Sequence, residues 1–590
     1  MRLGSHHRNE PSTGMVASEA PSRRFIDLLG GPSHLKWLLL CAFLGGLISA
    51  LPNLISALQS GSPVWIADND EILCAFLTSQ SYLHHIWRFS DPALPPGQGH
   101  VSYPWIVFAP GILTAKALRT GPGPVMFLLR IWGGVSLGAV WFLLIGEFVR
   151  KRWLAASFAI FFLFDDGVLA IRPIIRPLLV SFALLRGKGQ ELLATNPQLH
   201  PEWRLMTPAL NLGVALFYLF LLQRARRNPC RSTIYAAGGA FGLLIWSYFY
   251  FWTACILALA ISFLLDSEHR ALYAKVGGLG LLIGSPALVA SYLLKHSTSR
   301  DWLWRTDLFL PVPRFGPLGF SRLPTLLLIV SFFVVWRHRR DLIPLWAVSA
   351  SALALQYTIF FTGIEMEGFH WQYLWAYTLA LMVLLALLGF IEHKDKWIPY
   401  PLVALVILEC GIGLSLRVVE TVRTRQSTEF TAAYRSVQGQ LALHTPLRED
   451  AVIAGDKGFL DSVQILGPYR PLSDYVIEFS PSTTDRDLDE RWALNAFLLG
   501  VSRSDFLEHE RFYFSIARGR ERRDLAVREA RVQSQGEIFD RITSDPVQAI
   551  RKYEVRYVAA RRSCPLKPNI GVDWKAVQTG EWQIWERPNP

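Results

Sequence analysis

The sequence predicts a polytopic α-helical membrane protein with a soluble α/β domain at its carboxyl end. Of its 590 residues, 51% are hydrophobic, with 36 Phe and 21 Trp, and the mean hydropathy is +0.26. This exceeds the apolar content that a soluble chain of this length needs for its cores. From about residue 420 onward, Arg, Asp and Glu become abundant and the apolar runs become short, as in a soluble domain.

The positions of the basic residues indicate the membrane topology. The net charge of +12 comes from short clusters of Lys and Arg between apolar segments, which is the pattern of cytoplasmic loops and argues against a nucleic-acid partner. The six cysteines are scattered, without a CxxC pair or a metal-ligand spacing. We interpret them as small apolar packing residues.

An acidic cluster follows the first apolar segment. Residues 1–34 are polar and predict a disordered cytoplasmic tail. The apolar run 35–58 is too long for the core of a signal peptide, so we expect a signal anchor with its amino end inside. It would deliver Asp68, Asp70 and Glu71, within VWIADNDEILCA, to the outer face of the membrane.

A second apolar stretch, residues 103–118, lies in the same outer loop, 59–124. It is short for a membrane span and is interrupted by Pro104 and Pro110. If it crossed the membrane, the basic residues 150–152 would end outside, against the positive-inside rule. We therefore expect amphipathic helices that lie on the outer surface.

On this basis about eleven membrane spans are expected within residues 35–419. The spans are 35–58, 125–149, 153–170, 206–223, 233–249, 251–266, 272–294, 323–337, 342–362, 371–391 and 397–417. The loops that then fall inside are basic, which supports the assignment. An odd number of spans places the domain 420–590 outside the cytoplasm.

The carboxyl-terminal domain shows short apolar runs that predict strands at 451–455, 463–466, 555–560 and 582–586. Helices are expected near 487–499 and 545–552. The domain has no Gly-rich phosphate loop, nucleophile elbow or zinc spacing.

A family resemblance rests on the DNDE motif and the segment after it, SYPWIVFAPGILTAKALRTGPGPVMFLLRIWGGVSLGAVWFLLIGEFVRKR. Over residues 35–152 the chain resembles the amino-terminal module of GT-C glycosyltransferases, relatives of the protein O-mannosyltransferases and the lipid A aminoarabinose transferase. In that family an acidic pair in the first outer loop precedes a surface helix, a Gly-containing turn and a span that begins near an Arg, here Arg130. Tyr103–Pro104 stands where the family usually has two prolines.

The resemblance implies a GT-C-like fold in a bacterial inner (cytoplasmic) membrane. It also implies transfer of a sugar from a polyprenyl-phosphate-linked donor to an extracytoplasmic acceptor, which is a glycolipid, a glycan or a protein. Such a transfer needs a carboxylate that takes the acceptor's proton and positive charge near the departing phosphate.

The family pattern assigns catalysis to the acidic cluster. Asp68 or Asp70 would be the general base, and Asp70 or Glu71 would hold a divalent cation, Mg²⁺ or Mn²⁺. The alternative is that the three carboxylates cap a helix that starts near Ile72. Capping needs one carboxylate, so we favour a catalytic role for Asp68, Asp70 and Glu71.

Other outer-face residues are candidates for substrate binding. Asp165 and Asp166 end an apolar run, and would either line a cavity or lie among headgroups. Arginines that could bind the phosphate, or anchor the spans, are Arg172, Arg176, Arg204, Arg300 and Arg305. A short loop carries Glu365, Glu367 and His370, which would contact substrate or only solvate the turn. The aromatic turn 247–252 is expected to be a membrane-interface belt or a sugar-stacking surface.

Two other classes of function stay open. A transporter or flippase of lipid-linked glycans would need ionisable groups in the middle of several spans, whereas most charges here lie at span ends. A non-catalytic scaffold with an outer binding domain is distinguished by its tolerance of Asp68→Asn and Asp70→Asn.

Overall fold

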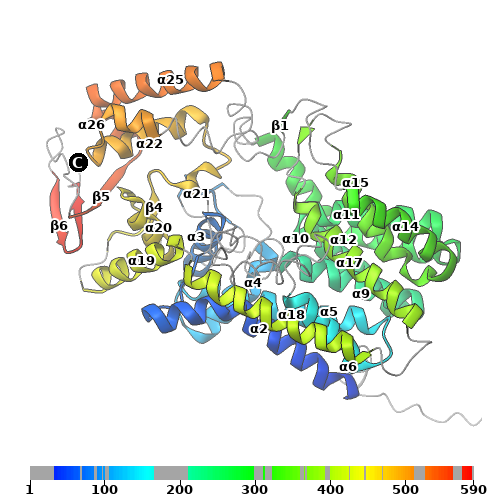
Figure 1. Ribbon diagram of the computed structural model, residues 1–590. Coiled ribbons are helices and arrows are strands. Elements are labelled where there is room, and N and C mark those ends of the chain that lie inside the picture. The colour runs from blue at the N-terminus through cyan, green and yellow to red at the C-terminus, as the bar shows by residue number, and fades with distance from the viewer. Residues whose placement is uncertain are drawn as a thin grey trace, which may run out of the picture.

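The protein consists of a large helical part and a smaller α/β part (Figure 1). The computed structural model describes residues 32–66, 69–84, 89–95, 98–99, 105–164, 210–297, 310–311, 322–358, 364–365, 369–391, 399–423, 425–443, 447–467, 469–509, 525–562 and 574–587. The helical part confirms the predominantly α-helical class, and the sheet near the carboxyl end confirms the predicted α/β character of that region.

Each of the eleven predicted spans contains a helix. These are α2 (Pro32–Ser60), α5 (Val125–Gly146), α6 (Arg152–Phe164), α9 (Asn211–Arg227), α10 (Arg231–Ser247), α11 (Phe249–Leu265), α12 (Arg270–Ser297), α14 (Arg322–His338), α15 (Ile343–Gln356), α17 (Phe369–Ile391) and α18 (Pro399–Arg423). Among the described residues, three stretches are helical, long and apolar enough to cross a membrane: His34–Ser60, Val125–Gly146 and Ser267–Leu293. These helices indicate a membrane protein, and the full count of eleven crossings stays a prediction.

Helices α2 and α5 cross at glycines. A Cβ atom on Gly134 would lie 2.2 Å from the carbonyl oxygen of Gly45, and one on Gly138 would lie 2.1 Å from that of Cys41. Gly134 and Gly138 are four residues apart and therefore share one face of α5, as in the small-residue motifs of membrane helix pairs. The backbones approach closely as a result, which fixes the position of α5 against α2.

The outer loop contains α3 (Asn69–His84) and α4 (Trp105–Leu118). The helix expected within residues 103–118 is confirmed, with Pro110 inside it. One face of α4, including Phe108 and Ile112, is buried, while Leu113 and Leu118 are exposed. An exposed apolar face suits a helix at the bilayer surface, and that location stays a prediction.

The carboxyl-terminal sheet has the strand order β4-β3-β5-β7-β6. Its strands are β3 (Val452–Gly455), β4 (Arg470–Pro471), β5 (Val555–Arg561), β6 (Lys575–Thr579) and β7 (Trp582–Glu586). Strands β3, β4 and β5 are parallel, and β7 runs antiparallel to β5 and β6. A separate antiparallel pair joins β1 (Leu310–Pro311) to β2 (Ile364–Glu365).

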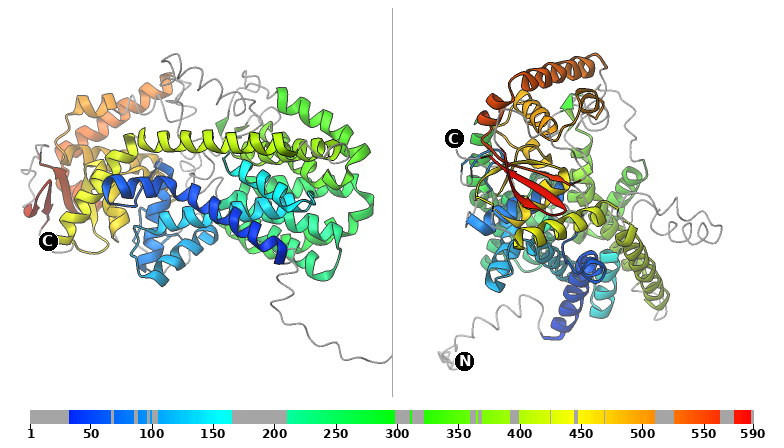
Figure 2. Two further views of the ribbon diagram at one scale, coloured as in Figure 1. Left: turned by 60° about the horizontal axis from the view of Figure 1, so that its bottom comes forward. Right: turned by 90° about the vertical axis from the view of Figure 1, so that its left-hand side faces the viewer.

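Helices cover both faces of this sheet, as the right view of Figure 2 shows. On one face, α19 (Arg425–Leu443) and α20 (Lys457–Leu466) pack on Ile453 and Ala559. On the other, α22 (Asp485–Leu498), α25 (Leu525–Ser544) and α26 (Pro546–Lys552) pack on Val452, Ala454 and Val558. The short α21 (Tyr475–Glu478) follows β4. The alternation of side chains along β3 therefore supplies both cores.

The predicted strands at 451–455, 555–560 and 582–586 are confirmed, as are the helices near 487–499 and 545–552. The predicted strand at 463–466 is wrong, because these residues form the second half of α20. Asp456 caps that helix by accepting a hydrogen bond from the Gly458 backbone N–H at 3.0 Å. Phe459, Leu460 and Val463 then recur at helical spacing on the buried face.

Candidate functional site

A buried ion pair holds the beginning of α3. The Nη2 atom of Arg130, on α5, lies 2.5 Å and 2.6 Å from the two carboxylate oxygens of Glu71. The side chains of Arg130 and Glu71 are 0% and 3% exposed. Glu71 is the third residue of α3, so this pair attaches the first turn of the acidic helix to α5.

The remaining contacts of Arg130 extend the attachment to α2. Its Nη1 atom donates to Asn53 Oδ1 at 2.9 Å and to the carbonyl oxygen of Trp65 at 2.8 Å. The guanidinium also lies over the Trp65 ring, 4.6 Å from its centroid. One buried cation therefore joins α2, the loop after it, α3 and α5.

The ion pair with Arg130 holds the Glu71 carboxylate in one position. Each of its oxygens accepts a hydrogen bond from Arg130, which fixes the carboxylate against α5. The pair fixes the first turn of α3, which contains Asp70, and the catalytic role of Glu71 stays a prediction. From the sequence, Arg130 belongs to the family pattern and Glu71 to the acidic cluster, without a contact between them. In the structure the two side chains form an ion pair.

Helix α3 begins at Asn69, earlier than the expected start near Ile72. Asp70 and Glu71 therefore lie in its first turn, where the helix dipole favours negative charge. Asp68 lies outside the described residues, and only the backbone of Asp70 is described. The capping and catalytic interpretations of these two residues both stay predictions.

The carboxyl-terminal domain packs directly on the outer loop. Ser79 of α3 donates to the carbonyl oxygen of Ile465 at 2.9 Å, and Thr431 donates to that of Val64 at 3.2 Å. A single apolar core combines residues of α3, α4 and the start of α5 with Phe430, Tyr434, Ile465 and Val476. The acidic loop and the carboxyl-terminal domain therefore share one apolar core, and the side of the membrane on which they lie stays a prediction.

Helices α18 and α19 follow one another from the helical part into the carboxyl-terminal domain, as the left view of Figure 2 shows. Arg417 on α18 is fully buried and donates to the carbonyl oxygens of Phe164 at 2.9 Å and Leu163 at 3.3 Å. These are the last residues of α6, where a cation is favourable. Sequence reasoning assigned no role to Arg417, because an Arg at the end of an apolar run has the pattern of an interface anchor.

His370, at the start of α17, meets the aromatic turn between α10 and α11. Its Nδ1 atom lies 2.5 Å from the Tyr248 hydroxyl, and its ring stacks on Tyr250 with centroids 4.5 Å apart. Next to it, Trp371 Nε1 donates to Thr253 Oγ1 at 3.3 Å. The two short outer segments that were predicted separately therefore form one cluster, in which the rings pack mainly on one another.

The other predicted substrate residues lie outside the described residues, apart from Glu365, for which the backbone alone is described, in β2. Those outside are Asp165, Asp166, Arg172, Arg176, Arg204, Arg300, Arg305 and Glu367. Their roles stay predictions.

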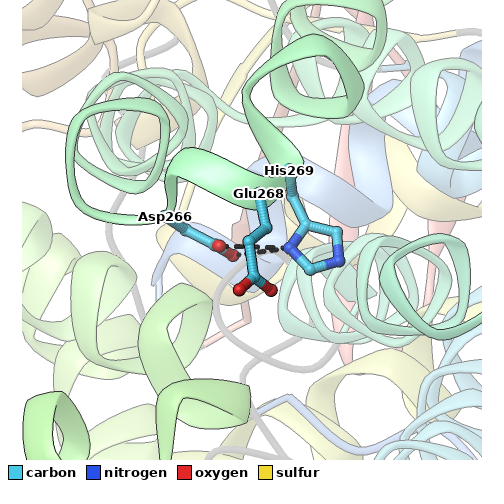
Figure 3. A group of neighbouring side chains, drawn as sticks. All are labelled: Asp266, Glu268 and His269. Atoms are coloured by element: carbon cyan, nitrogen blue, oxygen red, sulfur yellow. Dashed lines mark hydrogen bonds and ion pairs between the residues drawn. The ribbon is translucent and has the colours of Figure 1, made fainter.

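A group with the spacing of metal ligands occurs elsewhere, between α11 and α12 (Figure 3). It consists of Asp266, Glu268 and His269. The buried Asp266 already accepts hydrogen bonds from Arg226 Nη2 at 2.6 Å and from the Tyr273 hydroxyl at 2.8 Å. The Arg226 guanidinium supplies the positive charge that a metal would bring, so the group has the chemistry of an internal ion pair.

Comparison with known proteins finds no match by sequence and a distant similarity by structure. No model of a known protein family matches the sequence, and no curated protein matches it. Among solved structures, the chain is similar to the arabinofuranosyltransferase AftD from Mycobacteria, with 12% sequence identity and a TM-score of 0.43. The similarity covers 94% of this chain and 40% of that chain, so this protein spans well under half of the AftD length. With a likeness at this level, the function has to be argued from the residues of this chain.

Proposed function

We propose that the protein is a GT-C-type membrane glycosyltransferase. It moves a sugar from a polyprenyl-phosphate-linked donor to an extracytoplasmic glycolipid, glycan or protein, with Asp68 or Asp70 as the general base. The observation that carries the proposal is the buried Glu71–Arg130 pair, which fixes the first turn of α3 against α2 and α5. A buried charge pair costs desolvation, so its presence beside the acidic motif favours a turn that must be held in place.

The transfer reaction needs a base and cations that are correctly positioned around the reacting groups. The base takes the proton of the acceptor hydroxyl while the acceptor oxygen bonds to the anomeric carbon, and the bond from that carbon to the phosphate breaks. The polyprenyl phosphate leaves with the bonding electrons, and cations stabilise its charge. In this proposal Arg172, Arg176, Arg204, Arg300 and Arg305 supply those cations. Asp165, Asp166, Glu365, Glu367 and His370 contact the sugar or the acceptor.

The proposed mechanism uses no metal step. Asp70 and Glu71 are the residues that would hold a divalent cation, and the pair with Arg130 leaves each Glu71 oxygen a second lone pair for it. Fixed positive charge near a leaving phosphate can be supplied by arginines instead.

The proposal is tested in a deletion strain that is complemented with the wild-type gene or with the Asp68→Asn or Asp70→Asn variant. Mass spectrometry of the cell-envelope glycolipids and glycans should show a product that depends on the gene. Loss of a general base lowers the rate by about 10²- to 10⁴-fold, so at least one variant should lose that product at a normal protein level.

The matched control is Asp540→Asn, which changes an exposed carboxylate on α25. It should retain the product. If Asp68→Asn and Asp70→Asn both retain it as well, the transferase mechanism is wrong and a non-catalytic role is favoured.

A further inference from the structure

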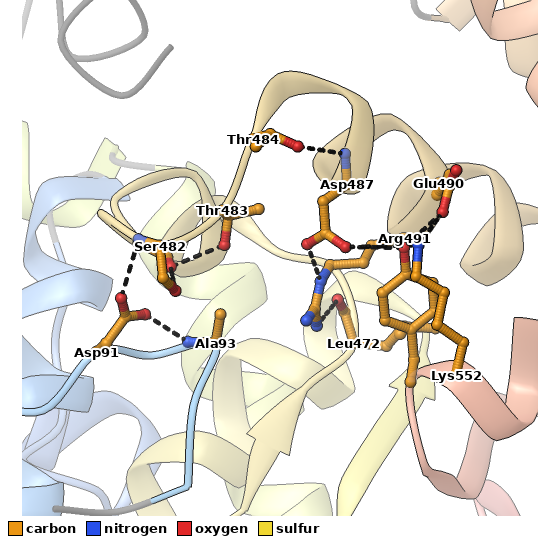
Figure 4. A network of polar contacts seen from close by, with 12 residues as sticks. Asp91, Ala93, Leu472, Ser482, Thr483, Thr484, Asp487, Glu490, Arg491 and Lys552 are labelled. Atoms are coloured by element: carbon orange, nitrogen blue, oxygen red, sulfur yellow. Dashed lines mark hydrogen bonds and ion pairs between the residues drawn. The ribbon is translucent and has the colours of Figure 1, made fainter. Parts of the chain in front are cut away.

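A polar pocket lies between the outer loop and the carboxyl-terminal domain (Figure 4). Its volume is about 540 Å³. Ala93 and Leu94 of the outer loop form one wall. The other wall is formed by residues of the carboxyl-terminal domain: Ser482, Thr483, Thr484, Arg486, Asp487, Glu490, Arg491 and Lys552. This volume falls in the range of about 300–1,000 Å³ that is typical of small-molecule sites.

Asp91 joins the two walls of the pocket. Its side chain is 2% exposed, and its two oxygens accept hydrogen bonds from different parts of the chain. The Ser482 backbone N–H donates to Oδ2 at 3.1 Å, and the Ala93 backbone N–H donates to Oδ1 at 3.0 Å. The pocket therefore exists where the loop that follows α3 is docked on the carboxyl-terminal domain.

The charged groups of the pocket are paired. Asp487 accepts hydrogen bonds from Arg491 Nε and from the Tyr553 hydroxyl, both at 2.9 Å. Glu490 accepts one from Tyr553 at 2.9 Å and another from Lys552. These pairings hold the carboxylates in place while leaving them as hydrogen-bond acceptors at the pocket wall.

The lining also offers donors and small hydroxyl groups. Arg486, 71% exposed, lies with its Nε 3.5 Å from Glu490. Arg491 is fixed over the Tyr553 ring, 4.6 Å from its centroid. Ser482, Thr483 and Thr484 line the pocket beside them.

The balance of these groups selects the class of ligand. The lining holds three cations, Arg486, Arg491 and Lys552, against the carboxylates of Asp487 and Glu490, so its charges are nearly balanced. An anion would approach both carboxylates, and an apolar ligand would cover polar groups without hydrogen-bonding to them. A neutral saccharide offers hydroxyl groups that each donate and accept, which matches a wall of paired guanidinium, ammonium and carboxylate groups.

We propose that this pocket binds a neutral oligosaccharide, and that this oligosaccharide is the acceptor of the transfer reaction. The identification as acceptor rests on the proposed function, whereas the binding itself does not. The pocket is connected to the acidic helix by the loop after α3 and by α20 and α21, which pack on α3. The carboxyl-terminal domain thereby gains a function that its sequence did not indicate.

The experiment uses the full chain purified in detergent and ligand-observed NMR. The probes are unbranched neutral tetrasaccharides built from pentoses or hexoses, a sulfated tetrasaccharide, and inorganic phosphate. At least one neutral probe should bind, without competition from phosphate. Arg486→Ala and Glu490→Gln should each weaken that binding about tenfold or more, because each removes a charge-assisted hydrogen bond. Ala93→Trp, which fills the pocket without changing a charge, should abolish it.

The matched control is Arg503→Ala, which removes an exposed arginine that pairs with Asp540 outside the pocket lining. It should leave binding unchanged. Neutral binding that persists in Ala93→Trp, binding of the sulfated probe alone, or no binding of any probe would each overturn the proposal. A chain that binds neutral saccharide but transfers no sugar would refute the proposed function and keep the binding site.

Discussion

Replacing Glu71 by alanine should release the first turn of α3. The substitution leaves the guanidinium of Arg130, which is 0% exposed, without its carboxylate partner. Removal of one member of a buried ion pair costs about 3–5 kcal/mol, because the other charge stays buried and uncompensated. We expect a loss of this size in the local stability of α3.

A double-mutant cycle separates the energy of the Glu71–Arg130 pair from the energy of their other contacts. Arg130→Met alone should also cost about 3–5 kcal/mol. In Glu71→Met/Arg130→Met no buried charge remains, and the main loss is the unmet acceptors of Asn53 and Trp65, about 1–3 kcal/mol each. At the middle of these ranges the coupling energy between the two sites is about 4 kcal/mol, with the double variant more stable than the sum of the two single effects predicts.

Hydrogen exchange measured by mass spectrometry on peptides from residues 69–84 reports this local stability. A loss of 3 kcal/mol corresponds to amide exchange that is about 100-fold faster. The control Asp540→Ala breaks an exposed pair with Arg503 and should cost less than about 1 kcal/mol. Additive effects of Glu71→Met and Arg130→Met, or unchanged exchange in Glu71→Ala, would refute the reasoning.

Three further predictions concern other parts of the molecule. Gly134→Ala should destabilise the α2–α5 pair by about 1–3 kcal/mol in detergent unfolding, because its Cβ would lie 2.2 Å from a backbone oxygen. In the control Gly239→Ala, the added Cβ would have no atom within 4 Å, so the free energy of unfolding should rise by up to about 1 kcal/mol. Equal effects of Gly134→Ala and Gly239→Ala on stability would contradict the close crossing of α2 and α5. Burial and the carboxylate of Asp474 raise the pKa of Asp461 well above its ordinary value. The stability that the protonated carboxyl contributes should therefore be lost as pH rises above about 4. Asp461→Asn should remove this loss in thermal unfolding measured between pH 4 and 8. An unchanged dependence of stability on pH in Asp461→Asn would exclude Asp461 as its source. Hydrogen bonds with Ser232 and Thr233 lower the pKa of the Cys230 thiol to about 7. In a chain whose other five cysteines are replaced by Ser, a membrane-impermeant maleimide should thus label Cys230 with half-maximal rate near pH 7, in inside-out vesicles and not in intact cells. Labelling of intact cells by this chain would reverse the topology.

Periodic features of the fold could be predicted from the sequence. The apolar runs at 125–149 and 371–391 are long enough that helix is the preferred structure, and both contain helices. The run 463–466 is too short for a helical period to be seen inside it. Its helical state depends on Asp456 and Phe459 upstream, so the strand prediction failed there.

The candidate site was predictable only in part. The acidic motif is visible as a cluster of neighbours in sequence, but the partner of Glu71 is 59 residues away, and partner choice is decided by the crossing of α2, α3 and α5. The pocket beside Asp91 could not be predicted, because Ala93, Asp487 and Lys552 meet only where the outer loop packs on the carboxyl-terminal domain.

We propose that a carboxylate at the start of α3 catalyses sugar transfer. The purified chain is incubated with radiolabelled polyprenyl-phosphate sugars and membrane glycan acceptors, and the transferred label is measured. We expect transfer by the wild type and by Asp540→Asn, and a loss of about 10²-fold or more in Asp68→Asn or Asp70→Asn. Transfer at the wild-type rate by both Asp68→Asn and Asp70→Asn would contradict the claim.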